Sequence, residues 1–151
     1  AELLLAHGDC AAGPTRILET LNERNFGILE GVAETACTDQ QAADELQWRT
    51  KTQPHFRPPG GESLEDTQNR VVRTWLADIV PAAMRGDVLV VSHGNVIKSV
   101  IGWYLSWPLE TIFLLPITNC LITRLDIPPQ GWLPEIQIAG SQETRSHAHP
   151  S

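Results

Sequence analysis

The chain has 151 residues, of which 42% are hydrophobic, a formal net charge of −7 and three cysteines. This length suits one domain with a real core, and the acidic balance without a basic patch excludes nucleic acid and anionic membranes as expected partners. The odd cysteine count without a Cys-x-x-Cys pair, and the lack of any apolar run of membrane-span length or visible signal peptide, favour a cytoplasmic protein.

The first third of the chain changes from helix formers to an irregular segment. Ala1–Ala6 consists of strong helix formers, and Thr15–Glu19 fits a short exposed strand. Leu21–Gly31 follows neither a period of two nor one of 3.6 and carries two glycines. We interpret Leu21–Gly31, called the LNER loop below, as an ordered loop of the kind that often carries function.

Two helices follow. The Thr and Gln spacing of a capping box predicts a helix over 38–48, before a rigid loop rich in Pro and Gly at Pro54–Gly61. Ser63–Asp66 predicts the start of a second helix that ends at Pro81 or over Met84–Gly86. One face of this helix is apolar and comprises Leu64, Val71, Val72, Trp75, Leu76 and Ile79.

The stretch Val88–Lys98 predicts a strand that turns directly into a helix. Val88–Val91 is wholly apolar, which is typical of a short strand buried on both faces in a parallel sheet. Apolar residues then recur at helical spacing until Pro108, at Val96, Ile97, Val100, Ile101, Tyr104 and Leu105. The turn between the two elements therefore holds Ser92–Asn95.

That turn has the chemistry of an anion site. The first backbone N–H groups of a helix are unpaired, and the helix dipole is positive there. Gly94 removes a Cβ from the path of an anion, and His93 adds a ring N–H or a full charge when protonated. A phosphoryl group is the expected guest, and a capped core helix with an incidental histidine is the alternative.

The C-terminal part predicts a hairpin. Ile117–Ile127 alternates well enough for a strand, and a Pro/Gly turn leads to a returning strand at Trp132–Ile138. Pro134 places the returning strand at an edge because proline cannot donate to a ladder. We expect one domain over 1–139 and a disordered tail over 140–151.

Three segments, in this order and spacing, resemble motifs of the histidine phosphatase superfamily, which includes cofactor-dependent phosphoglycerate mutases and many small phosphatases. They are LNERNFGILEG (Leu21–Gly31), PPGGESLEDT (Pro58–Thr67) and VLVVSHGN (Val88–Asn95). The resemblance covers nearly the whole chain up to about residue 139. It implies an α/β fold, a three-layer α/β/α sandwich of phosphoglycerate-mutase-like type.

The resemblance also implies phosphoryl transfer through a phosphohistidine, without a metal or another cofactor. His93 matches the second active-site histidine, which helps to hold the transferring phosphoryl group, and Glu23 matches the general acid that later acts as base. A positioned proton donor of this kind contributes roughly two to four orders of magnitude in rate. The positions that match substrate-binding residues are Arg24, Asn25, Phe26, Gly94 and Asn95, with Phe26 in place of the mutases' usual Tyr.

One motif of the family does not match. The partial match to the nucleophilic Arg-His-Gly motif is His7-Gly8, where Ala6 replaces the arginine. His7 also lies only sixteen positions before Glu23, which is too short a distance for the family's pattern. We interpret His7 as a loop residue and the chain as the C-terminal part of a longer protein, missing its first central strand. We therefore expect phosphomonoester hydrolysis by the intact parent and little or no turnover by this chain alone.

Other interpretations stay open. A phosphoglycerate mutase is the alternative enzyme, although the span between the LNER loop and the Gly-Glu-Ser motif is shorter than in the mutases. A non-catalytic module that binds a phosphate ligand is a second alternative. The expected partner is a small phosphorylated substrate, and a homodimer that exchanges an element to fill the sheet is a further alternative.

Overall fold

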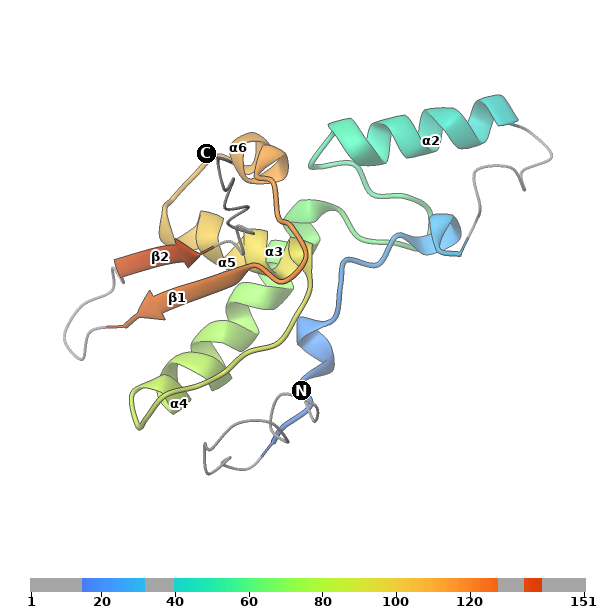
Figure 1. Cartoon of the computed structure of the whole chain (residues 1–151). Helices are drawn as coiled ribbons and strands as arrows, with labels where there is room; N and C mark the ends of the chain where they lie inside the picture. Colours follow the sequence, from blue (N-terminus) through green and yellow to red (C-terminus); the bar gives the residue numbers. More distant parts are fainter. Residues whose placement is uncertain (1–14, 32–39, 128–134, 140–151) are drawn as a thin grey trace, which may run out of the picture.

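The computed structural model describes residues 15–31, 40–127 and 135–139, and the side chains of 15–31 and 44–127. The elements are η1 (Glu19–Leu21), η2 (Gly27–Leu29), α2 (Gln40–Thr52), α3 (Leu64–Thr74), the π-helical turn η3 (Trp75–Ile79), α4 (Val80–Ala83), α5 (Gly94–Tyr104), α6 (Leu109–Leu114), β1 (Ile122–Asp126) and β2 (Glu135–Ala139). Figure 1 shows α3 and α5 beside the two strands, with α2 standing apart from them.

Helix α3 begins as the sequence predicts. The Ser63 hydroxyl accepts the Asp66 N–H at 3.0 Å, and the Asp66 carboxylate accepts the Ser63 N–H at 2.9 Å, which completes a capping box. Pro81 does not end the helical run, which widens into the π turn and continues as α4 to Ala83. Pro81 lies in the first turn of α4, where a missing N–H costs little, so the turn over 84–86 is the real end.

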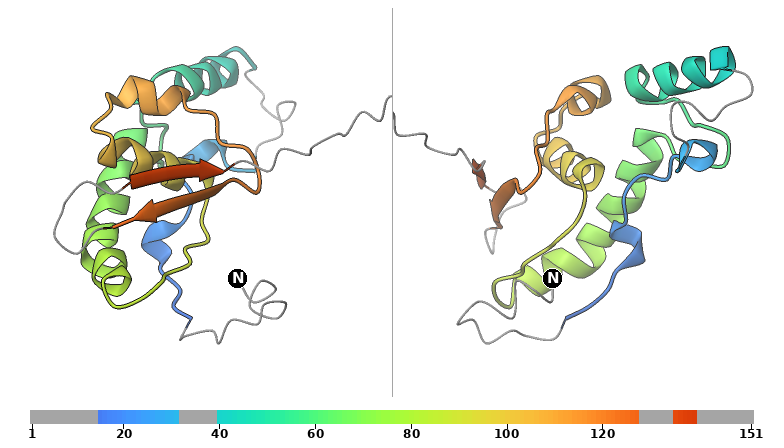
Figure 2. Two further views of the ribbon diagram at one scale, coloured as in Figure 1. Left: turned by 60° about the vertical axis from the view of Figure 1, so that its left-hand side comes forward. Right: turned by 45° about the vertical axis from the view of Figure 1, so that its right-hand side comes forward.

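The core lies between α3 and α5, which Figure 2 shows next to each other. Its buried members come from these helices, the π turn and η1, and are Leu21, Val71, Trp75, Ile79, Val96, Val100 and Tyr104. The Trp75 indole N–H donates to the Tyr104 hydroxyl at 2.9 Å, so the two polar atoms of the core are paired with each other. The predicted apolar face is confirmed at these positions, but Leu76 is 37% exposed.

The predicted buried strand at Val88–Val91 is wrong. The segment is extended but forms no strand, and Leu89 and Val91 are 71% and 56% exposed. No backbone hydrogen bond reaches it from the parts of the chain that the structure describes. An apolar run becomes a buried strand only when neighbouring strands pair with it, and none does so here.

The sheet of the described residues has two strands. β1 and β2 are antiparallel, with Ile122 opposite Ala139 and Asp126 opposite Glu135. The fold is α/β, but a central parallel sheet of the expected three-layer α/β/α sandwich is not among residues 15–31, 40–127 and 135–139. The hairpin itself is confirmed, with its first strand shorter than the predicted Ile117–Ile127.

Smaller differences concern single elements. The short exposed strand predicted at Thr15–Glu19 is wrong, because the segment pairs with no other segment among residues 15–31, 40–127 and 135–139, and its last residue begins η1. The helix predicted over 38–48 continues to Thr52, and α6 was not predicted. The helix at Ala1–Ala6, His7 and the 140–151 tail lie outside the described residues.

Candidate active site

One ion pair holds the LNER loop against α3. The Glu62 carboxylate accepts from Nε and Nη2 of Arg70, each at 2.8 Å, and from the Asn25 N–H at 3.1 Å. Arg70 also donates from Nη1 to the carbonyls of Thr20 at 2.6 Å and Asn22 at 3.2 Å. The hydrogen bond from Arg70, aided by that from Asn25, outweighs burial and lowers the pKa of Glu62. Glu62 is therefore an ionised anchor for the loop.

Arg24 fixes the same loop from inside. Its side chain is only 3% exposed, and it donates from Nε to the Glu62 carbonyl at 2.8 Å and from Nη2 to the Phe56 carbonyl at 3.1 Å. Burial lowers the pKa of Arg24 despite the nearby carboxylates. The guanidinium thus braces the loop in this structure, and its predicted contact with substrate stays a prediction.

Two glycines let the two motifs approach each other. A Cβ on Gly27, where φ is +59°, would collide with the Pro59 carbonyl, and one on Gly61 would lie 2.7 Å from the Asn25 carbonyl. The Asn25 side-chain oxygen accepts the Gly27 N–H at 2.7 Å, and the Phe26 N–H donates to a carboxylate oxygen of Glu30 at 3.0 Å. The contact between the LNER loop and the Pro58–Thr67 segment therefore requires glycine on both sides.

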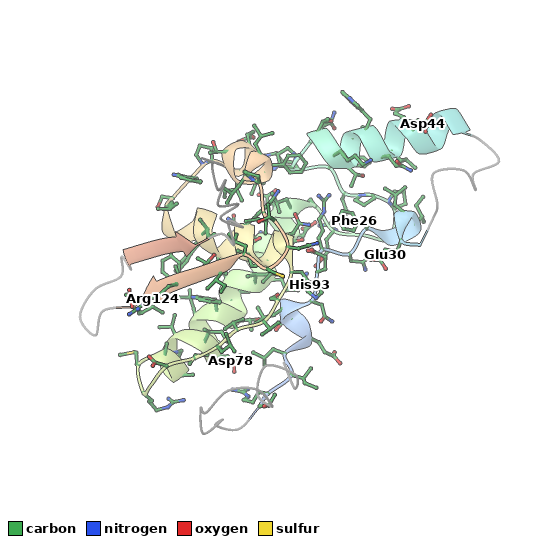
Figure 3. The ribbon with its side chains drawn as sticks, in the orientation of Figure 1. Phe26, Glu30, Asp44, Asp78, His93 and Arg124 are labelled. Atoms are coloured by element: carbon green, nitrogen blue, oxygen red, sulfur yellow. The ribbon has the colours of Figure 1, made fainter. Side chains whose placement is uncertain are left out.

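His93 begins the central helix, as predicted. It is the N-cap of α5 with an extended backbone, and its carbonyl accepts the Ile97 N–H at 3.0 Å. Its side chain makes no capping hydrogen bond and is exposed, so the ring is open to a ligand. Figure 3 shows His93 where the extended segment enters α5. Gly94 lies against Ile117 without crowding, because a Cβ there would make ordinary contact at 3.8 Å.

A hydrogen bond joins the two halves of the candidate site. The Ser92 hydroxyl donates to the Leu21 carbonyl at 2.7 Å, and Leu21 is buried in the core. This bond places the residue before His93 beside the start of the loop that carries Glu23. Burial lowers the pKa of Lys98 on α5, and the Glu23 carboxylate acts in the opposite sense. The Ser92 hydrogen bond thus brings the loop that carries Glu23 to the start of α5.

The Glu23 carboxylate is partly ordered by its own loop, since Oε1 accepts the Arg24 N–H at 2.7 Å. Arg70 and Lys98 were not singled out in the sequence, although both belong to this arrangement. The sequence offers only their positions as signals: Arg70 is a basic residue seven positions after the Ser63 cap, and Lys98 is one five positions after His93. The roles predicted for Glu23, His93, Asn25, Phe26, Gly94 and Asn95 stay predictions.

A separate open cavity of about 490 Å³ lies at the end of α2. Its lining does not include His93 or Glu23 and consists of Arg49, Thr52, Gln53, Pro54, His55, Phe56 and Arg57. The Arg49 guanidinium lies 4.1 Å from the Phe56 ring centroid, and Arg57 pairs with Asp66. Within the described ranges no cluster of His, Cys, Asp or Glu suits a metal ion, and none of the helices seen there is long and apolar enough to cross a membrane.

Comparisons with known proteins identify the family and the fold of the chain. The family model described as histidine phosphatase superfamily (branch 1) matches residues 1–136. The 2,3-bisphosphoglycerate-dependent phosphoglycerate mutase of Methylobacterium sp. (strain 4-46) is 39% identical over 90 residues, which are 58% of this chain and 42% of that protein. The 2,3-bisphosphoglycerate-dependent phosphoglycerate mutase 1 of Gloeobacter violaceus is 41% identical over 97 residues, 62% of this chain and 41% of that protein.

The chain thus spans about two fifths of the length of these curated relatives. Among solved structures, Bacillus stearothermophilus YhfR superposes with a TM-score of 0.66 and 24% sequence identity. The superposition covers 80% of this chain and 58% of that one, and it shows a shared fold.

Proposed function

Because the chain belongs to the histidine phosphatase superfamily (branch 1) and has that family's phosphoglycerate-mutase-like α/β fold, we propose that the LNER loop and the start of α5 form a phosphoryl site. The observation that carries the proposal is the Ser92–Leu21 hydrogen bond, which joins the segment ending in His93 to the loop bearing Glu23. The guest is the phosphoryl group of a small phosphomonoester.

Each group at this site has a chemical task. The His93 ring and the open amides at Gly94 and Asn95 stabilise the charge on the phosphoryl oxygens. Glu23 gives a proton to the leaving oxygen and later removes one from the attacking group. A histidine carries the phosphoryl group in the complete reaction, and residues 1–151 by themselves bind the group with little or no turnover.

In the first candidate function, phosphomonoester hydrolysis, water accepts the phosphoryl group. The short span between the LNER loop and Glu62 supports hydrolysis, because the mutases that the chain resembles have a longer insertion there. The second candidate is a phosphoglycerate mutase, which the names of the two relatives described above favour. Incubating a catalytically competent form of the protein with 3-phosphoglycerate separates the two candidates, since a phosphatase yields free glycerate and a mutase yields 2-phosphoglycerate.

The site itself is tested by titrating the 151-residue chain with inorganic phosphate in a calorimeter. We expect saturable binding that His93→Ala abolishes. His55→Ala is the matched control, because His55 lines the separate cavity at the end of α2 and its ring contacts Glu65 and Glu110. Absence of phosphate binding, or equal loss in both variants, contradicts the proposed site. Release of phosphate from a phosphomonoester, abolished by His7→Ala, contradicts the proposal that this chain is inactive alone.

A further inference from the structure

The extended segment between α4 and α5 presents an apolar surface that the described residues leave open. Leu89 and Val91 are 71% and 56% exposed, whereas Val90 between them packs against the core. Alternate residues of an extended chain point to opposite faces, so Leu89 and Val91 share one face, called the outer face below. Figure 1 shows the segment as a stretched chain that runs from the end of α4 to the start of α5.

The backbone of the same segment is open as well. Among residues 15–31, 40–127 and 135–139, no backbone hydrogen bond reaches Val88–Val91. An extended backbone whose N–H and C=O groups are not paired can take up another strand, and two copies of one edge can pair antiparallel about a two-fold axis. A second copy of this chain therefore offers both the backbone partner and the apolar side chains that the segment lacks.

One register of such a pair makes the outer face complementary to itself. When Val90 of one protomer lies opposite the partner's Val90, Leu89 lies opposite the partner's Val91. In the same register Asp87 lies opposite the partner's His93, and both residues are spaced by two from the apolar pair, so they share the outer face. Asp87 and His93 are exposed and make no hydrogen bond or ion pair within the described part of the chain. A shift by one residue loses both pairings and turns the side chains of one strand to the other face.

We propose that the stretch from Asp87 to His93 is a self-complementary dimer interface, in which two copies pair as antiparallel strands with Val90 opposite Val90. No element is exchanged between the protomers. Two contacts between Leu89 and Val91 cover the apolar surface, and two contacts between the Asp87 carboxylate and the His93 ring N–H fix the register. The interface is small, so we expect a dissociation constant of about 10–100 μM.

This interface is independent of the proposed function, but it affects how the dimer is measured. The partner's Asp87 occupies the His93 ring, which the proposed function assigns to phosphate. Assembly is therefore measured by sedimentation velocity in a buffer without phosphate, from about tenfold below to about tenfold above the expected dissociation constant. The fraction of dimer should rise with the concentration of the 151-residue chain.

A substitution on the outer face tests the surface. Leu89→Lys should weaken the dimer by at least about tenfold, because the two-fold axis places two ammonium groups in the apolar contact. Leu114→Lys is the matched control, since Leu114 on α6 is 78% exposed and lies outside the segment, and this variant should dimerise as the wild type does. Thermal unfolding shows whether each variant is folded. If Leu89→Lys is not, Val91→Lys takes its place in the comparison.

A charge exchange tests the register. Asp87→Lys should weaken the dimer about tenfold, because each new ammonium then lies opposite a His93 ring instead of receiving its N–H. Adding His93→Glu to Asp87→Lys restores opposite charges at both contacts and should return the affinity to within about threefold of the wild type.

Three results would overturn the proposal. They are a wild type that stays monomeric throughout the concentration range, equal weakening by Leu89→Lys and Leu114→Lys, and a double variant that dimerises no more tightly than Asp87→Lys. Phosphate binding is measured separately on the dilute monomer. Loss of the dimer proposal therefore leaves the proposed function standing, and absence of phosphate binding leaves the dimer standing.

Discussion

Removing the Arg70 side chain should release the LNER loop and destabilise the domain together. Arg70 makes two hydrogen bonds of 2.8 Å to Glu62 and two to the carbonyls of Thr20 and Asn22, and the side chains of Arg70 and Glu62 are only 24% and 23% exposed. Arg70→Met leaves the Glu62 carboxylate without its main partner. Hydrogen bonds to charged groups are worth about 1.5–3 kcal/mol net, and solvent still reaches this pair, so we expect a total loss of about 2–3 kcal/mol.

The loss should be visible in thermal and acid unfolding. For a chain of this size, 2–3 kcal/mol corresponds to a fall in Tm of about 5–10 °C. Because folding lowers the pKa of Glu62 below its ordinary 4.5, the pair stabilises the fold above that pH, and its contribution is lost as the pH falls from 4.5 through the lowered value. Arg70→Met should remove this part of the acid sensitivity.

A double-mutant cycle with Glu62→Gln tests the cause. Arg70→Met should lose more stability than Glu62→Gln, because Arg70 also donates to the carbonyls of Thr20 and Asn22. The double variant should lose clearly less than the sum of the two, because both single variants remove the Arg70–Glu62 interaction. Arg73→Met, one turn along α3 and exposed, is the matched control and should stay within about 0.5 kcal/mol of the wild type. Additive losses at Arg70 and Glu62, or an Arg70→Met variant as stable as the wild type, would refute the anchoring role.

Three further changes probe the surroundings of the site. Ser63→Ala removes the capping box of α3 and should cost about 1 kcal/mol in chemical unfolding, so an unchanged midpoint would contradict the cap. Gly27→Ala should cost well over 2 kcal/mol because its Cβ meets the Pro59 carbonyl. Gly31→Ala, also at positive φ but with open space around it, should cost only about 1 kcal/mol, and equal losses would show that strain rather than contact matters. The hydrogen bond from Glu65, helped by Glu110, raises the pKa of His55. The stabilising contribution of protonated His55 is therefore complete below pH 6.5, the ordinary pKa, and is lost as the pH rises through the raised pKa. An NMR titration of the Glu65→Gln variant should show a lower titration midpoint for the His55 ring than in the wild type.

Local signals were readable from the sequence. The cap of α3 depends on residues three apart, and the start of α5 depends on a change of period at Ser92, so both were predicted correctly. The hydrogen bond from Ser92 to Leu21, which joins the LNER loop to the start of α5, could not be predicted from any pattern within either segment. The Glu62–Arg70 pair was missed because it joins a loop to a helix eight residues on, and neither residue type predicts such a partner.

The largest error shows what a sequence pattern leaves out. Val88–Val91 carries the composition of a buried strand, but burial is a property of the neighbours and not of the segment. With no ladder partner among the described residues, Leu89 and Val91 face solvent. Of the two ends predicted for the second helix, Met84–Gly86 is confirmed and Pro81 is not, because Pro81 lies in the first turn of α4, where a missing N–H costs little.

The anchors of the LNER loop bear on whether the site can bind phosphate without turning over a phosphomonoester. The LNER loop is anchored at three points, by Arg24 to the backbone of Phe56 and Glu62, by Arg70 on α3, and by Ser92 at the start of α5. None of these anchors uses the ladder groups of Val88–Val91. If the proposed site is right, these anchors suffice to hold it, and the 151-residue chain binds phosphate in a His93-dependent way while Leu89 and Val91 stay exposed.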